Sequence, residues 1–548
     1  MNAMARTFYT TLLSSLYPGE MAARTAVRLQ ALVDGYRGRI PTPVDQALTE
    51  KDALLITYGD QVQQTGKPHL QTLAEFCGER LRGVVSGMHI LPFFPWSSDD
   101  GFSVKDYRRV DPALGDWNDV ERLGRSFRLM FDGVINHASV QGAWFQAFLR
   151  DEAPYRDYFL TVEGDPDLSA VVRPRALPLL TGFQTARGPR RVWTTFSADQ
   201  ADLDYHNADV LLEIMDILLG YAARGAQLIR LDAIAYLWKE IGTTCIHLPQ
   251  THACVQLLRA VLDEIAPHVM LVTETNVPHT ENISYFGDGT NEAQMVYNFA
   301  LPPLVMHTFR TGDSSALSNW ARGLELPSDR VTFFNFLASH DGIGLNPARG
   351  ILSQAEIDAL VQQTLAHGGR ISLKQNSDGS SSPYELNINY FDALSDPNGG
   401  EPLEIQVSRF MAAQAILLAL KGVPGIYFHS LFGSRSWQAG VEETGRNRTI
   451  NREKLELAGL EAELKHASSL RARVYNQYRS LLEKRRSNPA FHPQGGQEIL
   501  DVGTGVFGLR RTSPDGNRTM MCLQNVTNRN QTAMGAELQR YEMIWKDD

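Results

Sequence analysis

The stretch AQLIRLDAIAYLWK (226–239) decides the fold, because an apolar run ends abruptly in an acidic residue, Asp232. Two later stretches have the same form: MLVTETNVPH (270–279), which contains Glu274, and FNFLASHDGIG (334–344), which contains Asp341. A core strand gains nothing from ending in an unpaired acid, because burying a charge costs several kcal/mol unless the charge is paired or used. Carboxylates at the C-terminal rim of a strand barrel are where sugar-cleaving chemistry is commonly built.

Short apolar runs of the same kind alternate with helical patterns along much of the chain. Eight of them are predicted strands: LLITY (54–58), GMHILP (87–92), FRLMFDGVINH (127–137), AQLIRLD (226–232), VMLVTE (269–274), AQMVYN (293–298), VTFFNFLASH (331–340) and VPGIYF (423–428). The clearest helix between them is DVLLEIMDILLGYAARG (209–225), with Gly225 at its predicted end. Eight near-continuous apolar strands separated by helices predict an α/β fold, a parallel (β/α)8 TIM barrel.

Four further segments do not fit this alternation. Residues 1–51 are predicted to be a helical extension, which either covers the bottom of the barrel or makes a homodimer contact. The barrel domain then spans residues 52–487. Loop-inserted domains at 138–206 and 342–405 are expected to shape the substrate site, because long loops on a barrel carry specificity. A PDGN turn (514–517) between alternating strands predicts a small β domain over 488–548.

Composition excludes several classes of partner. The 548 residues carry a net charge of −10 and are 43% hydrophobic, which argues against nucleic acid or an anionic membrane as the main partner. The four cysteines show no CxxC spacing and are interpreted as reduced thiols. The N-terminal residues lack the features of a signal peptide, and no apolar stretch is long enough to span a bilayer. We therefore expect a cytoplasmic protein.

The three acids suggest distinct chemical roles. Arg230 lies two residues before Asp232, so both side chains point to the same side of a strand. The arginine is expected to hold Asp232 ionised and to lower its pKa for nucleophilic attack. Glu274 is then the proton carrier, which requires a raised pKa, and Asp341 stabilises positive charge on the sugar ring. Asp132, at the third strand, is interpreted as a support for the site.

Other candidates have alternative explanations that the residues alone leave open. His137 and His340 are donors for sugar hydroxyls, although His137 also fits an ordinary loop position. Phe196 and Tyr236 either stack on a sugar or pack in the core. The basic residues of two loops, Arg173 and Arg175 in one and Arg349 in the other, either bind an anion or are simply solvated.

Motifs along the chain resemble a known family. DGVINH (132–137), IRLDA (229–233), TE (273–274) and ASHD (338–341) match, in order, the four motif regions of the α-amylase clan, family 13 of the glycoside hydrolases. Further stretches are similar to its sucrose phosphorylase subfamily: HILPFFPWSSDDGFSVKDY (89–107), RPRALPL (173–179), WTTFSADQADLDY (193–205) and KEIGTTCIHLPQTH (239–252). The resemblance implies that Asp232 is the nucleophile, Glu274 the acid/base and Asp341 the transition-state stabiliser. It also implies that Asp106, His137, Arg230 and His340 hold the glucose unit, and that Arg175 lies in the acceptor site.

The chain departs from sucrose phosphorylases in its N-terminal extension, in Tyr107 and in the loop GIGLNPARGIL (342–352), where it is instead similar to glucosylglycerate phosphorylases. This resemblance implies reversible phosphorolysis of 2-O-α-glucosylglycerate to α-glucose 1-phosphate and D-glycerate, with net retention. The partners are then a small glucoside and inorganic phosphate, and the implied chemistry requires no metal or organic cofactor. The alternatives are phosphorolysis of sucrose or sucrose 6-phosphate, hydrolysis or transglucosylation of an α-glucoside, and a non-catalytic role in binding.

Overall fold

Eight parallel strands close into a barrel at the centre of the chain, as the sequence predicts. The computed structural model describes residues 3–45, 47–376 and 378–547. In order around the barrel the strands are β1 (Leu54–Thr57), β17 (Val423–Tyr427), β13 (Thr332–Asn335), β12 (Met295–Tyr297), β11 (Met270–Thr273), β10 (Ala226–Leu231), β4 (Arg128–Gly133) and β3 (Gly87–Ile90). Each predicted strand contains one of them. The predictions extended past the strand ends because the apolar character continues into the buried loops that follow.

Helices surround this barrel. The larger ones are α3 (His69–Arg80), α4 (Trp117–Gly124), α6 (Ala208–Ala223), α7 (Pro249–Ile265), α9 (Leu301–Thr311), α13 (Leu403–Ala419) and α17 (Leu470–Arg486). The predicted helix over 209–225 corresponds to α6, whose Asn207 side chain accepts a hydrogen bond from the Asp209 amide at the N-terminus. Gly225 follows the end of α6 with a positive φ of 97°, a conformation that glycine adopts without strain.

The N-terminal helices α1 (Ala3–Ser14) and α2 (Gly19–Tyr36) pack against the side of the barrel, on α6 and α7. Polar contacts fix them there: the Tyr9 hydroxyl donates to Glu264, the Tyr17 hydroxyl to the Tyr205 carbonyl, and Arg37 pairs with Glu264. The extension therefore contacts the flank of the barrel. A homodimer contact through its outer face stays a prediction.

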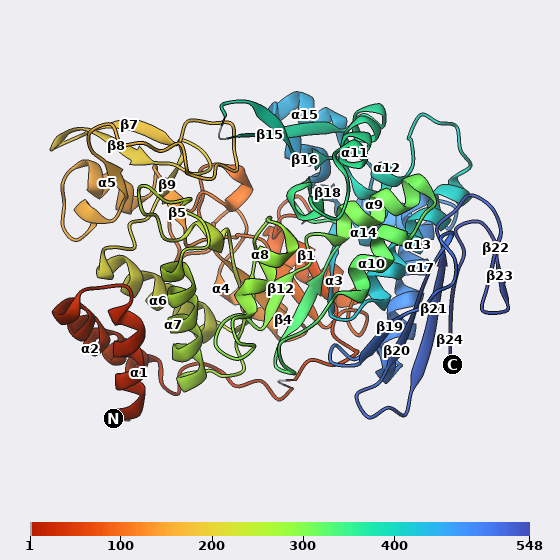
Figure 1. Cartoon of the computed structure of the whole chain (residues 1–548), viewed down its shortest axis with the longest axis horizontal. Helices are drawn as coiled ribbons and strands as arrows, with labels where there is room; N and C mark the ends of the chain where they lie inside the picture. The colour runs from red at the N-terminus through yellow and green to blue at the C-terminus, as the bar shows by residue number, and fades with distance from the viewer. Residues whose placement is uncertain (1–2, 46, 377, 548) are drawn as a thin grey trace.

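Both inserted segments carry small antiparallel sheets. The first contains β5 (His137–Ser139), α5 (Ala143–Leu149), β6 (Thr161–Val162), β7 (Leu180–Thr185), β8 (Gly188–Trp193) and β9 (Gln200–Asp202). The second contains β14 (Ile343–Gly344), α11 (Gln354–Ala366), β15 (Arg370–Gln375) and β16 (Ser381–Asn387). Figure 1 shows both along the upper edge of the barrel, with the N-terminal helices and the C-terminal sheet at opposite ends of the molecule.

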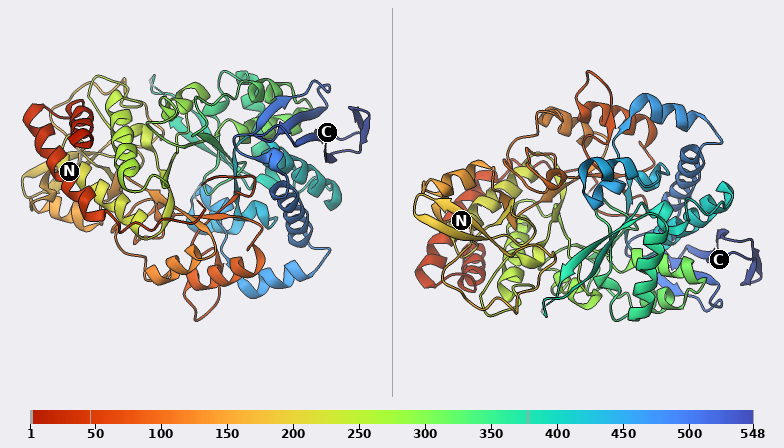
Figure 2. Two further views of the ribbon diagram at one scale, coloured as in Figure 1. Left: turned by 90° about the horizontal axis from the view of Figure 1, so that it is seen from below. Right: turned by 90° about the horizontal axis from the view of Figure 1, so that it is seen from above.

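The C-terminal region is a four-stranded antiparallel sheet of β19 (Gly496–Ile499), β20 (Val506–Thr512), β21 (Thr519–Asn525) and β24 (Met543–Asp547). Figure 2 shows it at the end of the molecule away from the N-terminal helices.

The buried Arg485 of α17 links two segments at the base of the barrel by donating hydrogen bonds to the Asp52 and Gly422 carbonyls. We propose to divide the chain at residues 51/52 and 487/488, which leaves all eight barrel strands in one unit.

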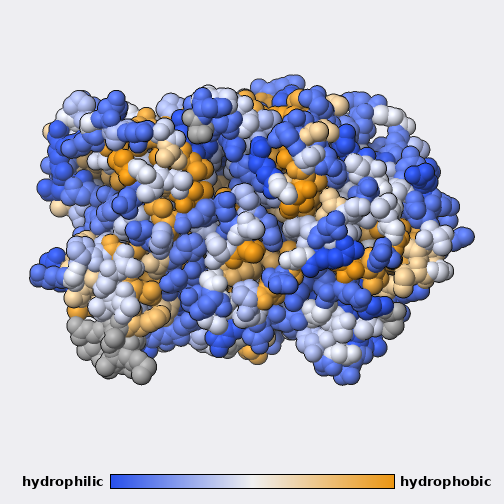
Figure 3. Space-filling view, viewed as in Figure 1, coloured by the Kyte–Doolittle hydropathy of each residue, from blue (hydrophilic) through white to orange (hydrophobic). Residues whose placement is uncertain are grey.

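One face of the molecule is mainly polar. Figure 3 shows that hydrophilic residues cover most of one face, with scattered apolar patches. None of the helices among the described residues is both long and apolar enough to cross a bilayer.

Candidate active site

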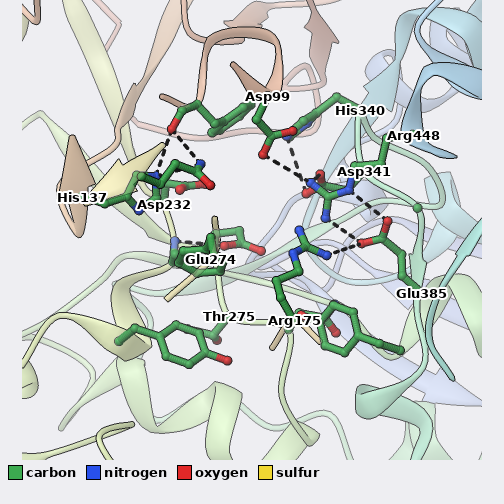
Figure 4. A pocket seen from close by; sticks show the side chains of 18 of the residues that line it. Asp99, His137, Arg175, Asp232, Glu274, Thr275, His340, Asp341, Glu385 and Arg448 are labelled. Carbon is green, nitrogen blue, oxygen red and sulfur yellow. Dashed lines mark hydrogen bonds and ion pairs between the residues drawn. The ribbon is translucent and has the colours of Figure 1, made fainter. Parts of the chain in front are cut away.

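A pocket at the C-terminal ends of the barrel strands brings the three acids together. Asp232 directly follows β10, Glu274 directly follows β11, and Asp341 lies in the loop after β13. The pocket encloses about 670 Å³ of space, including solvent at its mouth. In Figure 4 Asp232 and Glu274 lie on one side, while Asp341 lies on the other beside Arg448 and Glu385.

Arg230 is buried beneath the first two acids. Its Nη1 lies 2.8 Å from an oxygen of Asp232 and also contacts Asp132, while its Nη2 lies 3.8 Å from Glu274. Asp132 in turn accepts from His89 Nε2 at 2.7 Å, and neither residue lines the pocket. The position of Asp132 agrees with the supporting role expected for it.

Burial raises the pKa of Asp232 above its ordinary value, and Arg230 opposes the shift. The prediction of a net lowered pKa is therefore wrong, because removal from water and the nearby carboxylate of Asp132 outweigh the arginine. Arg230 still orients the carboxylate through the hydrogen bond to its Oδ1. Ala233, the residue after Asp232, has a positive backbone φ of 51°. This left-handed conformation is strained for alanine, and it turns the chain sharply at the site.

Glu274 has the properties of a general acid. Burial raises its pKa to about 7, with Asp232 and Asp341 adding to the shift and Arg230 opposing it. Its Oε2 accepts from the Ala233 amide at 3.0 Å, which fixes the carboxyl group beside Asp232. One carboxyl group that is protonated near neutral pH next to a second held by an arginine is the pairing that retaining glycoside chemistry needs.

Asp341 is surrounded by positive charge. Arg448 Nη1 contacts its Oδ1, and Arg452 Nη2 lies 3.6 Å from the same oxygen. Burial alone would raise the pKa of Asp341, but Arg448 and Arg452 hold it below its ordinary value. The carboxylate therefore remains ionised, as a stabiliser of developing positive charge must be.

The two predicted histidines line the same pocket. His137 Nε2 lies 2.9 Å from the Phe102 carbonyl oxygen, and its ring also contacts Phe196. The His340 ring stacks on Phe102 with a centroid distance of 4.6 Å. Burial and the arginines lower the pKa of His340 well below its ordinary value, so this imidazole is neutral.

The aromatic candidates Phe196 and Tyr236 also line the pocket, with their rings in an edge-to-face contact at 5.5 Å. Arg175 lines it too, 3.9 Å from Glu385 and over the ring of Tyr384. Its neighbour Arg173 donates to the Leu177 carbonyl and is not among the lining residues.

Three predicted ligands do not line the pocket: Arg230, which is 2% exposed and lies beneath the acids, Asp106 and Arg349. Asp106 does not line the pocket, because its carboxylate accepts from the Arg108 amide at 2.9 Å and stabilises its own turn. The acid that the structure brings into the pocket is Asp99, 3.9 Å from Arg448. Arg349 is also outside the pocket, where it contacts Asn346 and Gln354.

Several lining residues were missed from the sequence. Arg448 and Glu385 are the most important, since the half-buried Arg448 and the buried Glu385 form an ion pair at the pocket wall. Glu385 lies in β16 of the second inserted segment, and Arg448 follows the last barrel strand in the run GRNRTINRE (445–453). Two of the three arginines of this run, Arg448 and Arg452, reach Asp341, and the density of arginines in the run was the available signal.

A buried lysine holds the loop that carries His137. Lys239 Nζ lies 2.6 Å from Asn136 Oδ1 and 2.6 Å from Asp202 Oδ2, and both partners are fully buried. Asp202 also accepts from the Thr195 amide and hydroxyl. This cluster joins the barrel to the first inserted segment directly behind the pocket.

Comparisons with known proteins place this site in a family. The model of the α-amylase catalytic domain matches residues 83–341. A glucosylglycerate phosphorylase of Allomeiothermus silvanus is 55% identical over 94% of this chain and 91% of its own. A sucrose phosphorylase of Agrobacterium vitis is 32% identical over 83% of this chain and 91% of its own. The solved sucrose 6F-phosphate phosphorylase of Thermoanaerobacter thermosaccharolyticum shares the fold, with a TM-score of 0.77 at 23% identity over 92% of this chain and all of that one. The chain therefore belongs to the α-amylase family and, within it, to the glucosylglycerate phosphorylase family.

Proposed function

We propose that this chain is a retaining phosphorylase that converts 2-O-α-glucosylglycerate and inorganic phosphate reversibly into α-glucose 1-phosphate and D-glycerate. The observation that carries the reaction class is the pairing of Asp232, oriented by Arg230, with Glu274, whose pKa is raised to about 7. The acceptor follows from the 55% identity to a glucosylglycerate phosphorylase, compared with 32% to a sucrose phosphorylase.

In the first step Asp232 Oδ attacks the anomeric carbon, and the bond from that carbon to the glycerate oxygen breaks. Glu274 gives its proton to the departing oxygen, so this oxygen of glycerate leaves as a neutral hydroxyl group rather than an alkoxide. Asp341, kept ionised by Arg448, stabilises the positive charge that develops on the ring. The product is a β-glucosyl ester of Asp232.

In the second step a phosphate oxygen attacks the same carbon and displaces the Asp232 carboxylate. Two inversions give net retention at the anomeric carbon. Phosphate needs little help from a base because it is already ionised, but it must approach a pocket that holds several carboxylates. We propose that Arg175 attracts it, because this guanidinium has a side-chain exposure of 21% and lies 3.9 Å from its nearest carboxylate.

For the glucose unit we propose His137, His340 and Asp99 as ligands, with Asp99 in the place first predicted for Asp106. Phe196 and Tyr236 supply apolar walls. Arg349 has no role in this proposal, because its guanidinium is engaged by Asn346 and Gln354.

We further propose a cytoplasmic location, supported by four cysteines that are all free and buried.

The rival reactions differ only in the leaving group or in the acceptor of the glucosyl unit. Sucrose and sucrose 6-phosphate would use the same three acids, and a hydrolase would use water. A purely binding role is disfavoured by the complete set of acids in one pocket.

The test is the release of glucose 1-phosphate from 2-O-α-glucosylglycerate, sucrose and sucrose 6-phosphate, each with and without phosphate. Phosphate-dependent release from glucosylglycerate alone is expected. Release from a sucrose substrate would overturn the acceptor, and equal formation of free glucose without phosphate would overturn the reaction class.

A further inference from the structure

Asp199 is an acid near the pocket that the proposed mechanism does not use. It directly precedes β9 in the first inserted segment, next to the pocket-lining Gln200, but it does not line the pocket itself. Its Oδ1 is buried and has no hydrogen-bond partner. A buried carboxylate oxygen without a partner is unfavourable, so the presence of an acid at this position calls for an explanation.

The other oxygen of this carboxylate collects three hydroxyl groups from one short loop. Asp199 Oδ2 accepts from Ser98 Oγ at 2.5 Å, from Ser97 Oγ at 2.6 Å and from Ser103 Oγ at 2.8 Å. These serines lie on both sides of Asp99, the acid that lines the pocket from the same loop. A single carboxylate oxygen therefore joins the two ends of the loop that carries Asp99.

The backbone of this loop needs such support. Asp99, Asp100 and Gly101 have φ values of 53°, 48° and 110°. Three successive residues thus have positive φ, and only one of them is glycine. A conformation of this kind persists only where the surrounding structure holds it. Arg452 binds the Asp100 carboxylate at 2.5 Å, and the serine hydroxyls fix the chain before and after the two acids.

Asp199 is itself held by regular structure, as a group that positions others must be. Its carbonyl accepts from the Val140 amide at 3.0 Å, directly after β5, and β5 pairs with β9 in antiparallel register. Ser139 of β5 also lies with its Oγ 2.5 Å from Ser97 Oγ. The carboxylate therefore connects an irregular loop to a small sheet.

We propose that Asp199 is a positioning residue, which acts through the three serine hydroxyls to hold Asp99 in the orientation that binds glucose. This inference rests on the glucose-binding role proposed above for Asp99. Because Asp199 does not line the pocket, its effect on the reaction requires Asp99 to be present. A carboxylate with a purely structural role would affect the enzyme equally with or without Asp99.

The test is a double-mutant cycle of Asp199→Ala and Asp99→Ala with α-glucosyl fluoride as the substrate. The kcat/KM for fluoride release reports only the steps up to the first displacement, so neither glycerate nor phosphate affects it. In the wild-type background Asp199→Ala is expected to lower this kcat/KM about 10- to 100-fold. In the Asp99→Ala background the same change is expected to lower it by less than about 3-fold, because the group that Asp199 positions is already absent.

Two milder variants keep the test decisive if Asp199→Ala does not fold. Asp199→Asn retains one acceptor oxygen and should recover part of the activity. Ser98→Ala removes one of the three hydroxyls and should lower kcat/KM about 3- to 10-fold, again only while Asp99 is present. Asp165→Ala is the matched control, since this acid of the same inserted segment has a fully exposed side chain.

An equal loss in the two backgrounds, or no loss in Asp199→Ala and Ser98→Ala, would overturn the positioning role. Wild-type kcat/KM in Asp99→Ala alone would contradict the glucose-binding role of Asp99, and this inference with it. Failure of glycerate as the acceptor would appear only in the glucose 1-phosphate assay of the proposed function, so the two results are distinguishable.

Discussion

Arg448 and Glu385 form a two-point ion pair, with Nε 2.9 Å from Oε1 and Nη2 2.6 Å from Oε2. The remaining nitrogen of the same guanidinium contacts Asp341. A glutamate on an inserted strand therefore fixes the plane of the arginine that keeps the stabilising acid ionised. The geometry depends on a planar, forked donor, which lysine does not have.

Arg448→Lys should accordingly behave almost like Arg448→Ala. We expect each to lower kcat/KM for glucosylglycerate phosphorolysis by about 100-fold or more, since Asp341 would lose the guanidinium that holds it ionised beside the reacting ring. Initial rates of glucose 1-phosphate release measure this. The exposed Arg446, two residues earlier, is the matched control. Near wild-type activity in Arg448→Lys would show that charge alone suffices.

Phosphorolysis should decline above about pH 7. Glu274 must be protonated to assist the leaving glycerate, and its pKa is raised to about 7. The pH profile of kcat/KM reports this group in the free enzyme. In Glu274→Gln the alkaline limb of the pH profile should disappear, together with most of the activity. Glucosyl fluoride, whose leaving group needs no proton, should still form the glucosyl ester of Asp232. A profile that stays flat to pH 9 would contradict the assignment.

Deprotonation of Glu274 should lower the free energy of unfolding as the pH rises. The pKa is about 7 in the folded protein and about 4.3 in an unfolded chain, so the folded state binds the proton more tightly. The contribution of Glu274 to the free energy of unfolding is then greatest below about pH 4, and it falls by about 3 kcal/mol as the pH rises to 7. Thermal unfolding should show that Glu274→Gln gains stability over the wild type from pH 5 to 7, with no such trend in the exposed Glu325→Gln.

Lys239→Met should destabilise the fold by about 3–5 kcal/mol, because Asp202 would stay buried without its cation. The exposed Lys465→Met serves as the control. Urea unfolding gives the free-energy difference. Activity should fall as well, since Asn136 adjoins His137. If Lys239→Met unfolded at the same urea concentration as the wild type, the cluster would have no structural role.

The barrel and its acids could be predicted from the sequence because the signal is local. Asp232 and Glu274 directly follow apolar strands, so a short window contains both the element and the functional residue. Arg448 and Glu385 lie 63 residues apart on irregular or inserted segments, and only the folded chain brings them together. The choice between Asp106 and Asp99 depends on backbone geometry that the sequence does not reveal, since Asp99, which lines the pocket, has a left-handed φ of 53°.

The docking of the N-terminal helices on α6 and α7 also has a consequence for synthesis of the chain. Helix α2 ends at Tyr36, whereas α7 ends at Ile265. At about 5–20 residues per second, the ribosome completes the docking surface roughly 10 to 50 s after the extension emerges. The apolar side of α2, which includes Leu29 and Val33, lacks its complete docking surface during that interval, because α2 packs on α6 as well as on α7. Emergence of α7 is thus the event in translation that ends this exposure.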